Sequence, residues 1–92
     1  MKLNELYQII EDRKKNPKPD SYINSLIKSG EDRVIQKIGE EATEVVIAAK
    51  NKARGEIISE TADLLFHMLV LLSAFGIKPD DIFKELQNRK HK

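Results

Sequence analysis

The segment from Glu56 to Phe75 constrains the fold more than any other part of the chain. Between Leu64 and Phe75 only two residues are polar, His67 and Ser73. A segment this long and apolar is expected to form a helix that is buried nearly all round, in the core of the chain and in a subunit interface. A stripe of polar side chains nevertheless covers about 60° of this helix: Glu56, Glu60, Asp63 and His67.

A second acidic stretch lies on the helix predicted over Asp32 to Arg54. Its carboxylates share one helical face at about 100° per residue: Glu40, Glu41 and Glu44. The predicted apolar face fills roughly 120° on the opposite side and consists of Val34, Ile35, Ile38, Ala42, Val45, Val46, Ala49 and Ala53. We expect Gly55 to end this helix, so that the two long helices form an antiparallel hairpin whose carboxylates converge. Glu41 and Glu44 should then point into the seam, and Glu40 toward solvent or substrate.

Three shorter helices complete the prediction. Apolar spacing predicts a helix over Leu3 to Lys15, which the prolines at 17 and 19 end. A short helix follows, capped by Asp20 or Ser21, ended by Gly30 and carrying Tyr22, Leu26 and Ile27. Gly76 ends the long apolar helix, and the last helix begins near Pro79 and is docked by Ile82, Phe83 and Leu86. The chain is therefore predicted to be all-α, a single domain over residues 1–92 with a bundle of about five helices completed by dimerisation.

Composition excludes several classes of function. The 16 Lys and Arg against 15 Asp and Glu give a net charge of +1, which provides no general attraction to nucleic acid or to a membrane. The chain has no cysteine for a disulfide framework or a thiolate zinc site. Gly30 between two helices could suggest a DNA-reading helix-turn-helix, but the following helix is acidic where such proteins are basic. With no signal peptide and no apolar segment judged long and uninterrupted enough to span a bilayer, the protein is expected to be cytoplasmic.

The carboxylates predict a metal site, although glutamates at such spacing are most often solvated surface and Lys37 could simply pair with Glu41. Two carboxylates about 6 Å apart repel by about 3 kcal/mol at an effective dielectric constant of about 20. A divalent cation removes that repulsion, and oxygen ligands favour Mg²⁺ or Mn²⁺. The ligand candidates are Glu41, Glu44, Glu60 and Asp63. Glu40 could hold a further ion or accept a proton, while His67 is either a partner of the ligands or a histidine satisfied within the core.

These residues resemble a known family. The signature EExxE followed by ExxD is met by Glu40, Glu41, Glu44, Glu60 and Asp63, and it is similar to that of the all-α, MazG-like nucleotide pyrophosphohydrolases. Flanking residues resemble more narrowly the phosphoribosyl-ATP pyrophosphatases of histidine biosynthesis: Arg13, Pro19, Ser21, Tyr22, Leu26, Gly30, Lys37, His67, Gly76 and Ile77. Ile23 and Phe66 depart from the family, which commonly has threonine and tyrosine there.

The resemblance implies hydrolysis of the α,β-phosphoanhydride of 1-(5-phosphoribosyl)-ATP, assisted by Mg²⁺. Lys37 is the expected phosphate contact, and Arg13, Ser21 and Tyr22 are carried over as substrate-side groups. The family implies a homodimer or larger assembly, followed in the pathway by a separate phosphoribosyl-AMP cyclohydrolase. Two alternatives stay open: a broader pyrophosphohydrolase acting on nucleoside or deoxynucleoside triphosphates, and a non-enzymatic helical dimerisation module.

Overall fold

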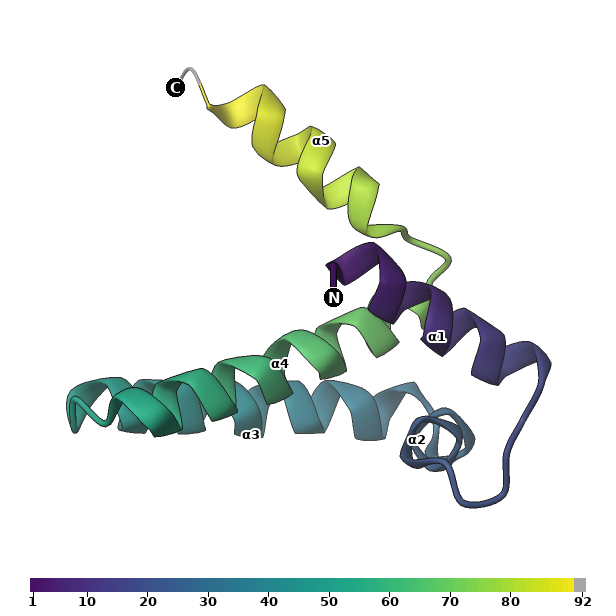
Figure 1. Ribbon diagram of the computed structural model, residues 1–92, viewed down its shortest axis with the longest axis horizontal. Helices are drawn as coiled ribbons and strands as arrows, with labels where there is room; N and C mark the ends of the chain where they lie inside the picture. The colour runs from purple at the N-terminus through teal and green to yellow at the C-terminus, as the bar shows by residue number, and fades with distance from the viewer. Residues whose placement is uncertain (91–92) are drawn as a thin grey trace.

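The computed structural model describes residues 1–90, which form five helices and no strand. The helices are α1 (Leu3–Lys15), α2 (Tyr22–Ser29), α3 (Glu31–Lys50), α4 (Arg54–Ala74) and α5 (Pro79–Arg89). In Figure 1, α3 and α4 run side by side in opposite directions, α1 lies over the C-terminal half of α4, and α5 projects away from the other helices. The predicted all-α architecture is confirmed.

The turn between α3 and α4 lies earlier than predicted. Helix α3 ends at Lys50 and α4 begins at Arg54, so Gly55 lies in the first turn of α4 instead of ending α3. The residue that reverses the chain is Lys52, which adopts a left-handed φ of 54°. The amides of Lys52 and Ala53 donate to the carbonyl oxygens of Ala49 and Ala48, each at 3.1 Å. These are the two bonds of a Schellman motif, in which a lysine takes the conformation that glycine usually adopts.

The core of the chain lies where α1, α2, the first half of α3 and the second half of α4 meet. Its buried side chains are Tyr7, Ile10, Leu26, Val34, Leu69 and Val70. Helix α4 is therefore not buried all round within one chain, since Ile58 is 59% exposed and Leu65 and Met68 are about 40% exposed. On α3, the predicted apolar face is only partly covered, with Val46 60% exposed, whereas Ala48 is buried.

Helix α5 does not dock as predicted. Ile82, Phe83 and Leu86 are all exposed by 42% or more. Two of them, Ile82 and Phe83, border an apolar groove whose other walls are Leu3, Leu65, Met68, Leu69, Leu72 and Pro79. The single chain thus leaves one apolar surface, formed by α4 and α5, open to solvent.

Helix α4 is long and apolar enough to be a candidate membrane span, contrary to the expectation from the sequence. By length and composition alone its 21 residues could cross a membrane, with a mean hydropathy of 1.6 in its most apolar window. Core helices often share these properties, and α4 packs against α3 and α1. It also carries Glu60 and Asp63 beside a third carboxylate, an arrangement that is costly in hydrocarbon.

A buried polar contact joins α1 to the end of α4. Ser73, which is 1% exposed, donates from its Oγ to Oε1 of Glu11 at 2.7 Å. Lys14 donates from its Nζ to the carbonyl oxygen of Ser73 at 3.0 Å and lies 3.6 Å from the Glu11 carboxylate. The hydrogen bond from Ser73, together with the charge of Lys14, lowers the pKa of Glu11 although partial burial opposes this shift.

Because the pKa of Glu11 is lower in the folded chain, this contact should stabilise the fold above the ordinary glutamate pKa of 4.5 and lose its effect as the pH falls through the folded value. We expect Ser73→Ala to lower the free energy of unfolding by about 1.5–3 kcal/mol at pH 7 and by much less at pH 3. Urea denaturation at both pH values measures the difference, with the exposed Ser59→Ala as control. An equal loss at both pH values would show that the Glu11 charge has no part in it.

Candidate active site

Three carboxylates meet across the α3–α4 seam. One oxygen from each of Glu41, Glu60 and Asp63 lies within 4.8 Å of the others. Glu41 comes from α3, whereas Glu60 and Asp63 lie one helical turn apart on α4. Glu41 and Glu60 are half-buried and Asp63 is exposed, so the group opens to solvent on one side. The antiparallel hairpin therefore brings together side chains that are about twenty positions apart in the sequence. We call this group the acidic trio.

The electrostatics of the acidic trio centre on Glu60. Partial burial raises the pKa of Glu60, and a hydrogen bond to Glu41 and the negative charges of Glu41, Asp63 and Glu44 raise it further. All these effects disfavour the ionised form of Glu60 in the folded chain. A positive charge placed among the three carboxylates would reverse that preference.

The remaining predicted residues on α3 lie outside the acidic trio. Glu44 is exposed and does not join it, although it was expected in the seam. It is rotated by about 60° around the helix from Glu41, and this rotation carries it to the solvent edge. Glu40 is exposed as predicted, and its Oε1 lies 3.8 Å from Nη1 of Arg33. Lys37 is half-buried, and the ion pairs of residues 1–90 do not include one between Lys37 and Glu41.

His67 links the acidic trio to the second helix. It is 4% exposed, and its Nδ1 lies 2.7 Å from the carbonyl oxygen of Asp63. A carbonyl only accepts, so Nδ1 donates to it, and in the neutral ring Nε2 then accepts from the hydroxyl of Tyr22 at 2.9 Å. Both ring nitrogens are satisfied, and His67 contacts the backbone of Asp63 instead of its carboxylate. This histidine positions Tyr22 relative to α4.

An open cleft of about 680 Å³ lies beside these residues. Its walls are Arg13, Lys18, Pro19, Asp20, Ser21, Tyr22, Ile23 and Phe66. Three of the predicted substrate-side groups, Arg13, Ser21 and Tyr22, therefore share one surface. Ser21 also caps α2, since its Oγ accepts from the amide of Asn24 at 3.3 Å. The cleft combines cationic side chains from α1 and the following loop with aromatic rings from α2 and α4.

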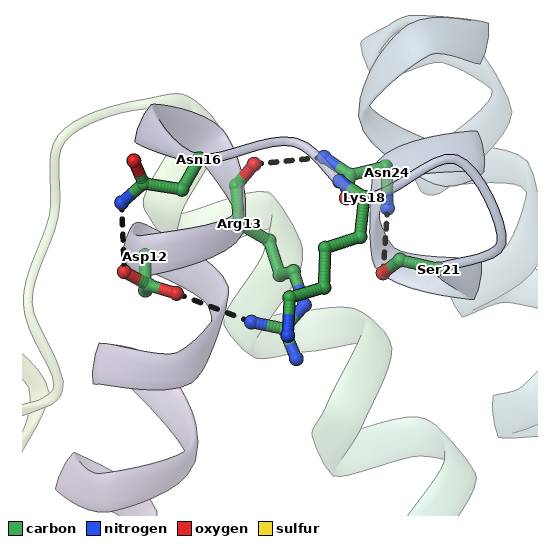
Figure 2. Close-up of polar contacts among 6 residues, drawn as sticks. All are labelled: Asp12, Arg13, Asn16, Lys18, Ser21 and Asn24. Atoms are coloured by element: carbon green, nitrogen blue, oxygen red, sulfur yellow. Dashed lines mark hydrogen bonds and ion pairs between the residues drawn. The ribbon is translucent and has the colours of Figure 1, made fainter.

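Two residues at the cleft are not among the predicted site residues: Lys18, which lines it, and Asn24, which bonds the backbone amide of Lys18. Figure 2 shows Asn24 between the end of α1 and the loop that follows. Its Oδ1 accepts from the amide of Lys18 at 2.8 Å, and its Nδ2 donates to the carbonyl oxygen of Arg13 at 2.7 Å. A polar residue three positions after a helix cap was the only available signal, and it does not specify these long-range partners.

These features define an all-α protein whose candidate site suits divalent cations and phosphate groups. The chain belongs to the phosphoribosyl-ATP pyrophosphohydrolase family, whose model matches residues 3–90. The family resemblance inferred from the sequence is thus confirmed.

Curated relatives match over most of the chain. The phosphoribosyl-ATP pyrophosphatase of Geotalea daltonii is 55% identical over 87 residues, which cover 95% of this chain and 82% of that protein. The corresponding protein of Clostridium acetobutylicum is 49% identical over 90 residues, or 98% of this chain and 82% of the relative. The histidine biosynthesis bifunctional protein HisIE of Thermoanaerobacter pseudethanolicus is 49% identical over 83 residues, which are 90% of this chain but 38% of that longer protein.

Proposed function

We propose that the protein is a pyrophosphohydrolase of histidine biosynthesis that splits 1-(5-phosphoribosyl)-ATP at its α,β-phosphoanhydride, giving phosphoribosyl-AMP and pyrophosphate. Family membership and the names of the relatives support this substrate. The structural observation that carries the proposal is the acidic trio, in which three carboxylates lie within 4.8 Å of one another at a solvent-open seam. A non-enzymatic helical dimerisation module would gain nothing from three carboxylates that repel one another.

The acidic trio fits a divalent cation by the chemistry of its donors. Glu41, Glu60 and Asp63 supply hard oxygen atoms without any thiolate. Partial burial and then the neighbouring carboxylates raise the pKa of Glu60, and a cation would offset both effects. Glu44, at the edge of the seam, is the proposed fourth ligand. When bound, Mg²⁺ or Mn²⁺ would neutralise phosphate charge and lower the pKa of a coordinated water.

The chain's own side chains have proposed roles around that ion. Glu40 faces solvent beside the acidic trio. We propose that it accepts a proton from the attacking water or holds a further metal ion. Lys37 lies one turn before Glu41 on α3 and would bind the phosphates. His67 holds the ring of Tyr22 through its Nε2, so Tyr22 can contact substrate in a fixed orientation.

The exposed apolar surface on α4 and α5 supports a homodimer as the active form. Leu65, Met68, Ile82 and Phe83 are each more than 40% exposed and border one groove, and a second copy of the chain would cover them. We expect sedimentation to give twice the chain mass of 10.5 kDa, and a monomer at micromolar concentration would contradict this assembly. We also expect the protein to act in the cytoplasm and to pass its product to a separate phosphoribosyl-AMP cyclohydrolase.

A substrate panel tests the proposed function. Pyrophosphate release should be at least about a hundredfold faster from phosphoribosyl-ATP than from ATP, dATP or dCTP at equal concentration. Similar rates for all four would favour the broader nucleotide pyrophosphohydrolase. The absence of release from any of them, in a folded protein supplied with Mg²⁺, would favour the non-enzymatic module.

A further inference from the structure

Two cationic side chains line the cleft, and of the two only Arg13 forms an ion pair within residues 1–90. Figure 2 shows the side chain of Lys18 extending from its loop toward the guanidinium of Arg13, and both line the cleft. The Asp12 carboxylate lies 3.1 Å from Nη1 of Arg13, and Asp20 is the one carboxylate among the residues that line the cleft. Both positive charges border the same cleft, so a multivalent anion bound there would be attracted to each of them.

The backbone that carries these cations is fixed in advance. Asn24 bonds the amide of Lys18 and the carbonyl of Arg13 through opposite ends of its side-chain amide, at 2.8 and 2.7 Å. The prolines on either side of Lys18 further restrict the loop. Binding an anion here would therefore cost little ordering of the loop backbone.

The cleft is also lined by two aromatic rings, and one of them, Phe66, lies on the same helix as Glu60 and Asp63. The rings of Tyr22 and Phe66 are stacked, with centroids 5.9 Å apart and planes inclined by 26°. Tyr22 is 51% exposed, yet its hydroxyl is held by the buried His67. Phe66 follows Asp63 by three residues on α4, which is about 4.5 Å along the helix axis. A nucleoside that contacts the rings of Tyr22 and Phe66 is long enough to extend to phosphates at the acidic trio.

Building on the proposed function, we infer that this cleft is the subsite for the phosphoribosyl end of the substrate. Arg13 and Lys18 bind its phosphate monoester, while Tyr22 and Phe66 pack against the adjoining adenine. The monoester is the group that phosphoribosyl-ATP has and ATP lacks, and it is remote from the triphosphate. The two cations in the cleft are therefore specificity-determining residues, distinct from the acidic trio that acts on the phosphoanhydride.

Calorimetric titration of the full chain with phosphoribosyl-AMP, AMP and pyrophosphate, all with Mg²⁺, tests this assignment. Loss of one charged hydrogen-bond partner corresponds to about a tenfold or larger change in affinity. We expect Lys18→Met and Arg13→Gln each to weaken phosphoribosyl-AMP binding by at least about tenfold, and AMP and pyrophosphate binding by less than about twofold. Lys15→Met, which removes an exposed lysine outside the cleft, should change none of the three.

Three results would overturn the assignment. Equal losses of affinity for phosphoribosyl-AMP and AMP would show that the cations bind the phosphate of the adenylate. A loss of affinity confined to pyrophosphate would show that they bind the triphosphate end. Unchanged affinity for all three probes would show that the cations bind no part of the substrate. Because the readout is binding, these results judge the cleft separately from the proposed function, which is judged by the rates of pyrophosphate release from the substrate panel.

Discussion

Glu60→Gln is expected to lower kcat/KM for pyrophosphate release by about a thousandfold or more while leaving the metal-free fold at least as stable as the wild type. Cation-assisted steps commonly supply several kcal/mol of transition-state stabilisation, and each 1.36 kcal/mol is about tenfold in rate. The stability effect has the opposite sign because glutamine removes one of three carboxylates that lie within 4.8 Å. The raised pKa of Glu60 also predicts that loss of this charge does not destabilise the metal-free fold, since the charged form of Glu60 is disfavoured in the folded state.

The matched control is Glu56→Gln, which removes a carboxylate from the preceding turn of the same helix. Glu56 is exposed and lies outside the acidic trio, so its loss should change kcat/KM by less than about threefold. Steady-state assays and thermal melts in EDTA give both readouts. If Glu60→Gln lowered the melting temperature of the metal-free protein and left turnover intact, the carboxylate of Glu60 would be a structural group without a role in the reaction.

Removal of divalent cations should abolish turnover and lower the melting temperature of the wild-type protein. A ligand at about a hundred times its dissociation constant stabilises the fold by about 2.7 kcal/mol, which for a chain of this size corresponds to a shift on the order of 10 °C. Differential scanning calorimetry in EDTA and in Mg²⁺ measures the shift. Mn²⁺ should restore both activity and melting temperature.

Salt screening provides the necessary control for that comparison. Sodium chloride also weakens repulsion among exposed carboxylates, but it does so without binding between them. At matched ionic strength we expect sodium chloride to reproduce only a small part of the shift and none of the activity. A full reproduction of the shift by sodium chloride would mean that the acidic trio needs only screening, not a bound ion.

The convergence of the acidic residues was predictable because it depends on local periodicity. Two same-face pairs on antiparallel helices must meet if the helices pack along those faces, and Glu41, Glu60 and Asp63 do. Helix α1 likewise has the predicted bounds of Leu3 and Lys15. Periodicity specifies angles around one helix but not the line along which a neighbour packs. Glu44 was therefore assigned to the seam, whereas the packing leaves it exposed.

The turn and the cleft depend on interactions that the sequence pattern does not encode. Glycine is the residue that most often adopts the left-handed conformation at a helix end. Here Lys52 adopts it, and Gly55 lies inside α4. Asn24 joins Lys18 to Arg13 through hydrogen bonds that span up to 11 residues, and Tyr22 reaches His67 across 45. Side-chain contacts of this kind arise only once α1, α2 and α4 have packed together.

We propose that Glu41, Glu60 and Asp63 together would hold a divalent ion between α3 and α4. The most direct measurement is a crystal structure of the protein soaked with Mn²⁺, with the ion located by its anomalous scattering. We expect an anomalous peak within bonding distance of carboxylate oxygens from both helices, with Glu41 among the ligands. A protein saturated with Mn²⁺ whose ions all bind elsewhere, leaving the carboxylates of the acidic trio without metal, would contradict it.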